Sequence, residues 1–518
     1  MTRSQPLEIE LKLLLPPAQA PDFVKRMARR RVAPVTQALV TRYFDTPGFD
    51  LAACGIALRV RRAGRRWMQT LKTEGERQGG LSTRVEHEMP VAGGALDWAR
   101  FPPEALAHVP GSLRGAVSPV FETCFTRTAW QVRGRGGAQI EVALDVGEVR
   151  AGDRCMPLCE IELELRQGPP DALFALALDW ARTFDCLPFD VSKAERGTRL
   201  ARGEVAGPAK GEPLVLQAQG SVEDGFSAIV QNCLAQFQAN LPGVLCLDSQ
   251  GHEKASTGPQ PIYDSEYVHQ ARVALRRLRA AVRLFRRACV VPQDLLDGLR
   301  TQVVTLGPAR DWDVLCEETL PTIAPHADDR AMWESGVQVI EAYRRQVHAD
   351  MRAALRTACP GAWLLAMQRW LLQRGWRQAP EAQRFVQMAP LDAWARHALR
   401  RGHRRLVRGA REYAGLAPAG RHALRIAIKR QRYSAEFFQL LCAEHRHVPY
   451  LAALRALQNG LGWANDAHVA AILLRDAPFD AGPMGAFARG WLAAMAAGGG
   501  SETIAGQLKK FVKLRTCW

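Results

Sequence analysis

The hydrophobic period of the chain changes near residue 200. Before that point, short runs such as "LEIELKLLL" (7–15) and "CEIELELRQG" (159–168) alternate apolar and polar residues with period two, as β-strands do. From about residue 221, long Ala-, Leu- and Arg-rich segments with helical spacing follow. The sequence therefore predicts an α+β multidomain protein: an N-terminal antiparallel sheet or barrel with flanking helices over 1–203, a linker at 204–220 and an all-α region over 221–518.

The net charge of +17 is spread unevenly along the 518 residues. Residues 1–220 hold 30 Lys and Arg against 26 Asp and Glu, whereas residues 221–518 hold 39 against 26. An excess confined to the helical region favours a polyanionic partner for that region.

Cysteine usage and the N-terminal residues predict a cytoplasmic protein. The 12 cysteines are scattered, with no CxxC pair and no Cys/His cluster at zinc spacing. The segment "MTRSQPLEIE" does not resemble a signal peptide, and the longest uncharged stretch is a poor membrane span because Gln, Asn, Pro and Gly interrupt it. We expect reduced thiols, a cytoplasmic location and no membrane association.

Charged residues in the strand-like region repeat with one parity, so each group shares one face of a sheet. A solvated face is the ordinary interpretation of one such run. Several runs of both signs favour a closed barrel with a charged lumen, because like charges facing each other across strands destabilise a sheet unless something lies between them. Carboxylates would hold a hard divalent cation there, and Arg and Lys would hold a polyanion such as a phosphate chain. The groups are Glu8, Glu10 and Lys12; Arg59 and Arg61; Thr70 and Lys72; Arg84, Glu86 and Glu88; and Glu160, Glu162 and Glu164.

The ordered series "EIELK", "RYFDT", "LRVRR", "LKT", "TRVEHE", "ALDVG", "EIELEL" and "SKAERG" resembles the CYTH superfamily, the triphosphate tunnel metalloenzymes. The resemblance covers about the first 200 residues. It implies an eight-stranded antiparallel barrel whose lumen binds triphosphate and Mg²⁺ or Mn²⁺. The implied metal-side carboxylates are Glu8, Glu10, Asp145, Glu160 and Glu162, with Glu164 as a substitute or assistant. The implied catalytic and substrate-binding residues are Lys12, Arg59, Arg61, Lys72, Arg84, Glu86, Arg127 and Lys193.

The helical region repeats internally. His269–Phe285 ("HQARVALRRLRAAVRLF") recurs as His422–Phe438 ("HALRIAIKRQRYSAEFF"), and "LGPARDWDV" from Leu306 recurs as "LGWANDAHV" from Leu461. The nearly equal offsets predict a duplicated multi-helix unit, with halves at about 221–375 and 376–518. A basic stripe recurs in both copies, and a single stripe of this kind is usually a solvated helix face. Because like charges on one helix face repel, its recurrence favours a bound anion.

The two basic helices and the "LGxxRDxDV"-like segments resemble the CHAD domain (conserved histidine α-helical domain) over about 221–518. The resemblance implies two four-helix bundles with a central basic surface that binds inorganic polyphosphate, and the basic segment "ARHALRRGHRRLVRGAR" could enlarge that surface. Asn465-Asp466 in the second copy departs from Arg310-Asp311 in the first. The polyphosphate-binding candidates are His269, Arg272, Arg276, Arg277, Arg279, His422, Arg425, Lys429, Arg430, Arg432, Arg401 and Arg405.

Together the two resemblances predict a metal-dependent inorganic triphosphatase with a polyphosphate-binding C-terminal domain. Such a protein could associate with polyphosphate granules. Two alternatives remain open: a polyphosphate-binding adaptor with a weakly active tunnel, and a class IV-type adenylate cyclase. No P-loop GxxxxGK[ST] is present, which disfavours an ordinary nucleotide-binding ATPase. Nucleic acid is disfavoured as a partner because the chain has no aromatic RNP-type platform and no zinc finger.

Overall fold

The computed structural model describes residues 7–217, 219–247, 264–378, 380–477, 481–497, 501–516 and 518. The chain divides into two compact units. The barrel unit comprises Met1–Ala209, Gln238–Tyr267 and Cys359–Arg374, and the helical unit comprises Lys210–Phe237, Val268–Ala358 and Gly375–Trp518. The domain limits predicted from the sequence remain predictions, and residues 1–6 and residue 218 of the predicted linker lie outside the described residues.

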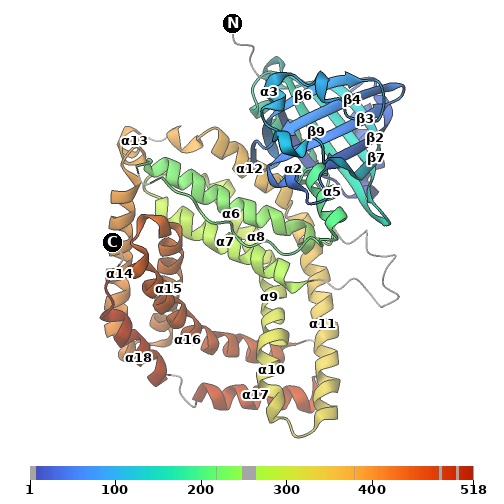
Figure 1. The fold of residues 1–518 in the computed structure, drawn as a ribbon. Coiled ribbons are helices and arrows are strands. Elements are labelled where there is room, and N and C mark those ends of the chain that lie inside the picture. The colour runs from blue at the N-terminus through green and yellow to red at the C-terminus, as the bar shows by residue number, and fades with distance from the viewer. Residues whose placement is uncertain are drawn as a thin grey trace. The chain divides into compact units, whose positions relative to one another are not determined.

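Eight antiparallel strands form a closed barrel (Figure 1). The strand order is β1-β9-β8-β7-β2-β3-β4-β6, and pairing of β6 with β1 closes the sheet, which confirms the predicted eight-stranded barrel. Two short strands, β5 (Glu76–Gln78) and β10 (Leu187–Pro188), add to β6 and β1. The barrel strands are β1 (Leu7–Leu14), β2 (Val35–Asp45), β3 (Ile56–Ala63), β4 (Arg66–Thr73), β6 (Leu81–Val91), β7 (Ser118–Arg133), β8 (Gln139–Ala151) and β9 (Arg154–Gln167).

The outer face of several strands is covered by helices α1 (Ala20–Ala28), α4 (Asp171–Ala181) and α12 (Pro360–Leu372), which share one apolar core with the strands. Leu11 and Leu13 of β1 belong to this core and are fully buried. Because successive side chains of a strand alternate in direction, Glu8, Glu10 and Lys12 point the other way, into the barrel. The polar face of the first strand is therefore its inner face.

Helix α12 lies within the barrel unit although the last long barrel strand, β9, ends at Gln167 and α12 begins only at Pro360. Arg369 donates two hydrogen bonds to the carboxylate of Asp171 on α4, at 2.6 and 2.7 Å. Gly361 lies so close to the barrel chain that a Cβ there would be 2.0 Å from the carbonyl oxygen of Cys186. These contacts fix α12 against α4 and the β10 segment.

Helix α5 (Lys193–Arg202) brings two cationic side chains to the barrel. Ser192 and Glu195 form a capping box at its start, which satisfies backbone N–H groups that have no intrahelical partner. A Cβ on Gly197 would be 2.0 Å from the ring of Phe121, so glycine allows α5 to approach β7 closely. Lys193 and Arg196 are buried on the barrel side of the helix.

The C-terminal region is helical, as predicted. The repeated basic segments form α7 (Ser265–Phe285) and α15 (Pro418–Phe437). Phe285 and Phe438, which occupy equivalent positions in the two repeats, have ring centroids 6.4 Å apart. The other helices of this region are α6 (Val222–Val244), α8 (Gln293–Thr305), α9 (Gly307–Val314), α10 (Leu320–Ile323), α11 (Arg330–Thr357), α13 (Glu381–Gln387), α14 (Leu391–Arg411), α16 (Glu444–Asp476), α17 (Gly482–Ala497) and α18 (Ser501–Val512).

Within the described part of the chain, no helix is both long and apolar enough to cross a membrane. The eleven cysteines in that part are free thiols.

Candidate functional sites

Three carboxylates from adjacent strands converge inside the barrel. Asp145 of β8 lies opposite Glu160 of β9, and with Glu162 they offer oxygen atoms that all lie within 4.8 Å of one another. Lys193 of α5 reaches this acidic cluster, with its Nζ 2.7 Å from both Asp145 and Glu162 and in contact with Glu160. Arg127 of β7 pairs with Asp145 and Glu162. Lys193 and Arg127, which the sequence analysis predicts as phosphate ligands, thus neutralise the negative charge of the acidic cluster.

A second charged group lies around the first strand. Glu8 accepts hydrogen bonds from Lys72 and Arg84, each at 2.8 Å. Lys72 is also 3.1 Å from Glu86, and Glu86 is 3.4 Å from Arg59. All of these residues lie on the inner parity of their strands.

The charges around Glu8 and Glu10 affect the two carboxylates in opposite ways. Burial acts to raise the pKa of Glu8, but Lys72 and Arg84 outweigh it and hold the pKa below its usual range. Burial also raises the pKa of Glu10, and the neighbouring Glu162 raises it further. Lys12 and Arg84 contact Glu10 only at 3.7 Å, so its compensation is weaker. Glu10 therefore interacts both with the charged residues around Glu8 and with the acidic cluster.

Arg59 and Arg61 of β3 retain donor capacity toward the lumen. Among the described residues Arg61 forms no ion pair, and its Nε donates to the hydroxyl of Thr41 at 3.2 Å. Burial, followed by the charges of Arg59 and Arg127, lowers the pKa of Arg61 to about 10, so the side chain still carries its charge at neutral pH. The Nε of Arg59 is buried without a hydrogen-bond partner. Buried donors of this kind are costly unless a ligand satisfies them.

Glu164 lies opposite Glu10 across β9 and β1, outside the acidic cluster. It pairs with Arg166 of the same strand, and burial raises its pKa to about 7. It is not one of the three residues of the acidic cluster.

Two lumen residues were missed by the sequence analysis. Arg196 is buried and pairs with Glu160, and its place one turn after Lys193 on the same helix was an available signal. Tyr43 lies opposite Arg59 across β2 and β3, where Arg59 and Arg61 counter the effect of burial and lower the pKa of its phenol. Tyr43 lies in the "RYFDT" segment, and its alternation with Arg42 and Phe44 was the signal for its position on the inner face.

The acidic cluster fits a hard divalent cation. Mg²⁺ and Mn²⁺ prefer carboxylate oxygens, and three oxygens within 4.8 Å of one another form a compact donor set. The donors are Asp145, Glu160 and Glu162, and Glu10 adjoins them. Glu8 is held by Lys72 and Arg84 instead.

In the helical unit, the basic faces of the two repeats meet. Burial lowers the pKa of Lys429 on α15 to about 8, and the charges of Arg425 and of Arg276 on α7 add to this effect. Arg272 and Arg425 occupy equivalent positions, and each lies 3.9 Å from an aspartate of its own repeat, Asp311 or Asp466. Buried guanidinium nitrogens of Arg272, Arg276 and Arg425 have no hydrogen-bond partner. This group, Arg272, Arg276, Arg425 and Lys429, is called the central basic cluster below.

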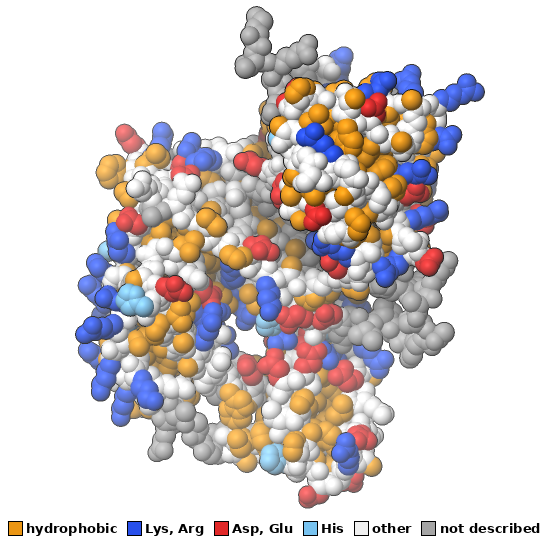
Figure 2. Space-filling view, viewed as in Figure 1, with side chains coloured by type: hydrophobic (Ala, Val, Ile, Leu, Met, Phe, Trp, Pro, Cys, Tyr) orange, Lys and Arg blue, Asp and Glu red, His pale blue; other side chains and the backbone are white. Residues whose placement is uncertain are grey.

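The remaining basic candidates are distributed differently. Arg430 lies near Arg279 and Arg405, whose charges contribute to lowering its pKa after the larger effect of burial. Arg277 donates to Gln236 and Asn232 of α6, and Arg432 donates to Gln458 and Glu436, so these two guanidinium groups hold neighbouring helices together. His269 is partly buried, whereas His422, Arg279, Arg401 and Arg405 are exposed. Figure 2 shows Lys and Arg side chains gathered over α14.

A closed barrel with carboxylates and cations on its inner face, followed by a duplicated basic helical region, defines a two-domain class of protein with a charged barrel lumen. A family model for the CYTH domain matches residues 6–198, and one for the CHAD domain matches residues 228–475. The chain therefore carries a CYTH domain followed by a CHAD domain.

Two relatives illustrate the match. The inorganic triphosphatase of Haemophilus influenzae is 33% identical over 211 residues, which cover 37% of this chain and 54% of that protein. The matched segment thus spans about half the length of this curated relative. The crystal structure of the CHAD domain from the plant Ricinus communis superimposes with a TM-score of 0.51 and 29% identity, and the match covers 60% of this chain and 99% of that one.

Proposed function

We propose that the barrel hydrolyses inorganic triphosphate to diphosphate and phosphate in a metal-dependent reaction. The observation that carries this proposal is the inner face of the barrel, which presents an unsatisfied donor of Arg59 and the unpaired guanidinium of Arg61 together with a compact acidic cluster. A phosphate chain needs cations for its oxygens, and a metal ion needs the carboxylates. The similarity to a triphosphatase supports the same substrate.

Phosphoryl transfer depends on positioning and charge neutralisation more than on covalent help from the protein. Arg59 and Arg61 would bind the oxygens of the chain, and Lys12, Lys72, Arg127 and Lys193 would add contacts as their carboxylate partners turn to the metal. A divalent cation bound at Asp145, Glu160 and Glu162 supplies further neutralisation of phosphate charge. With the chain fixed, water attacks the terminal phosphorus, the P–O bond to the bridging oxygen breaks, and diphosphate leaves.

We propose in addition that the central basic cluster binds inorganic polyphosphate. Its four cations come from two helices, and three of them have buried donors without partners. Like charges held this close repel each other, and a bound polyanion would offset this electrostatic repulsion. The exposed Arg401 and Arg405 of α14 would extend the surface.

The test is phosphate release by the full-length chain from inorganic triphosphate, ATP, diphosphate and long-chain polyphosphate, with Mg²⁺, with Mn²⁺ and with EDTA. We expect release from triphosphate that EDTA abolishes. If no metal supports release from triphosphate, the enzyme proposal is wrong, and polyphosphate binding without turnover would point to the adaptor alternative. Formation of cyclic AMP from ATP would point to the cyclase alternative.

A further inference from the structure

One position of the central basic cluster differs between the two repeats. Only ten of the 69 Lys and Arg residues of the chain are lysines, and Lys429 is one of them. Its counterpart in the first repeat is Arg276, because each lies seven residues after the histidine that begins its copy, His269 or His422. A guanidinium stays protonated, whereas an amine can lose its proton and act as a nucleophile. The exchange therefore places one potential nucleophile among guanidinium groups.

Four charged residues from three helices act on the amine of Lys429, whose side chain is partly buried. They are Arg425 and Arg432 of the same helix, Arg276 of α7 and Asp466 of α16. Three of the four are cations. The carboxylate of Asp466 is engaged elsewhere, since it lies 3.9 Å from Arg425 and accepts a hydrogen bond from Asn465 at 3.3 Å. All of these residues belong to the helical unit.

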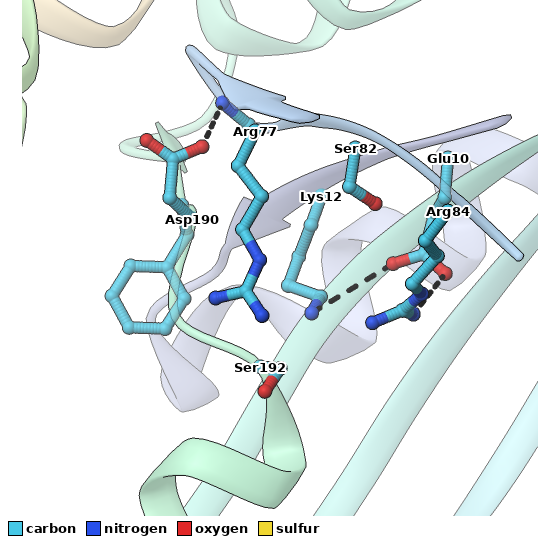
Figure 3. Close-up of a pocket in the computed structure, with 9 residues that line it drawn as sticks. Glu10, Lys12, Arg77, Ser82, Arg84, Asp190 and Ser192 are labelled. Carbon is cyan, nitrogen blue, oxygen red and sulfur yellow. Dashed lines mark hydrogen bonds and ion pairs between the residues drawn. The ribbon is translucent and has the colours of Figure 1, made fainter. Parts of the chain in front are cut away.

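Lysines of the barrel have a different environment. Lys12 lies 3.7 Å from Glu10 (Figure 3), and Lys72 donates to Glu8 at 2.8 Å. A carboxylate at such a distance favours the charged ammonium form. Among the residues that the structure describes, Lys429 forms no ion pair of this kind, and burial together with the charges of its neighbours lowers its pKa to about 8.

This environment leaves a substantial fraction of the Lys429 amine neutral. At pH 7.5 a pKa of about 8 gives about one quarter neutral amine, against about one part in a thousand at the ordinary value of 10.5. Lower basicity also makes each neutral amine less nucleophilic, as it does for thiols, so the net gain in reactivity is about tenfold. Lys429 should therefore react faster than an exposed lysine with an electrophile that reaches it.

The neighbouring guanidinium groups favour one class of electrophile. The Nε atoms of Arg276 and Arg425 are buried without a hydrogen-bond partner, and such donors suit phosphate oxygens. An acyl phosphate has a phosphate group for the arginines and an electrophilic carbonyl carbon for the amine. Phosphate is also the leaving group, so the same guanidinium ions would stabilise the charge that develops as it departs.

We propose that Lys429 is a modification site, acylated by acyl phosphates whose phosphate group binds Arg276 and Arg425. The amine attacks the carbonyl carbon, and a C–N bond forms as the C–O bond to phosphate breaks. The electron pair of that bond leaves with the phosphate, which takes up the proton that the nitrogen releases. The product is an uncharged amide, so acylation removes one of the four positive charges of the central basic cluster. Its effect on polyphosphate binding rests on the function proposed above.

The main test incubates the full-length chain with acetyl phosphate at pH 7.5 and follows acetylation of each lysine by mass spectrometry of its peptides. We expect the initial rate at Lys429 to exceed the rates at the exposed Lys25 and Lys509 at least about tenfold. Excess inorganic phosphate competes for the arginines. It should lower the rate at Lys429 at least about fivefold and leave the rates at the two exposed lysines unchanged.

Acetic anhydride separates the reactivity of the amine from binding of the phosphate group, because this reagent carries no charge. Lys429 should still react faster than Lys25, but inorganic phosphate should have no effect. Arg276→Gln combined with Arg425→Gln should lower the rate with acetyl phosphate at least about fivefold. Arg300→Gln combined with Arg330→Gln removes the same charge from exposed positions and should leave the rate unchanged.

Two results would overturn the modification site. One is an equal rate of acetylation at Lys429 and at the exposed lysines. The other is a fast rate at Lys429 that inorganic phosphate does not lower, since the phosphate group would then not be bound. Acetylated chain should bind long-chain polyphosphate at least about threefold more weakly than untreated chain. If untreated chain binds no polyphosphate but Lys429 is still acetylated selectively, the polyphosphate proposal is wrong and the modification site stands.

Discussion

Arg127 and Asp145 lie directly opposite each other on β7 and β8, and the guanidinium donates to both carboxylate oxygens, at 2.8 and 2.7 Å. One partner is a predicted phosphate ligand and the other a predicted metal ligand. In the ligand-free barrel, each therefore neutralises the other. A metal ion that binds Asp145 would free Arg127 for an anion, and an anion that binds Arg127 would free Asp145 for a metal ion.

This mutual release predicts that metal and anion bind cooperatively. We expect Mn²⁺ to bind at least about fivefold more tightly in the presence of saturating diphosphate, after correction for the metal that diphosphate binds in solution. Calorimetry with the full-length chain measures the two affinities. In Arg127→Met the coupling should fall toward unity, because the carboxylates are then no longer held by that guanidinium. Equal coupling in Arg127→Met and wild type would contradict the idea.

Loss of the first-strand carboxylates should abolish turnover. We expect Glu8→Gln combined with Glu10→Gln to lower the rate of metal-dependent triphosphate hydrolysis by at least about a hundredfold, in line with the loss of preorganised charge at other active sites. Circular dichroism should show that the barrel still folds. The control is Glu148→Gln, since Glu148 pairs with Arg150 on the outer parity of β8. Retained activity in the double variant would remove Glu8 and Glu10 from the site.

Glu164 predicts a pH-dependent stability difference. Its pKa of about 7 in the folded protein is above the ordinary value of 4.5, so the folded state prefers the neutral acid. The associated stabilisation is complete below about pH 4.5 and is lost as the pH rises through about 7. Glu164→Gln stays neutral, so in EDTA its thermal midpoint should match the wild type near pH 5 and exceed it by about 2 °C or more at pH 8. A constant difference at both pH values would show that Glu164 does not titrate in this range.

Lys429 predicts proton uptake when polyphosphate binds. With a pKa of about 8, this side chain is about half neutral at pH 8, and a bound polyanion would raise the pKa and favour the charged form. Binding of long-chain polyphosphate at pH 8 should therefore take up about half a proton, measured by calorimetry in buffers of different ionisation enthalpy. Lys429→Arg keeps the positive charge and should bind without this uptake. The same uptake in Lys429→Arg would assign the proton to another group.

Polyphosphate binding should also depend steeply on salt. We expect the affinity of the full-length chain to fall at least about tenfold between 50 and 200 mM NaCl, because each cation–phosphate contact releases counterions. Replacing Arg272 and Arg425 with Gln should weaken binding and flatten this dependence, while the exposed pair Arg300 and Arg330 serves as a control of equal charge. Duplex DNA that binds as tightly as polyphosphate at equal salt would contradict specificity for phosphate chains.

The barrel was predictable because a strand with period two reveals which residues share a face. That pattern does not say which face is inside, and for β1 the answer depends on apolar residues of α1, α4 and α12 that pack on Leu11 and Leu13. It also does not give the pairing inside the lumen. Lys72 pairs with Glu8 across 64 residues of chain, a distance in sequence over which local patterns carry no information.

The repeated helices were predictable because the two copies have nearly equal offsets. The role of each basic side chain was not, since position on a helix face does not identify the neighbouring helix. Arg277 shares the repeated pattern with Arg276, yet it donates to Gln236 and Asn232 of α6. Likewise, nothing local in the α12 sequence distinguishes a helix that packs on α4 from one that packs on other helices.

The position of α12 within the barrel unit sets an order for folding during synthesis. The eight strands are complete once residue 167 has left the ribosome, but the apolar core they share with α12 requires residues up to Leu365 and Ala366. At typical elongation rates this delay lasts about 10 to 40 s. During that interval the surface around α4 that α12 later covers lacks its partner helix. Cutting the chain between the two regions after synthesis would therefore not release a complete barrel unit.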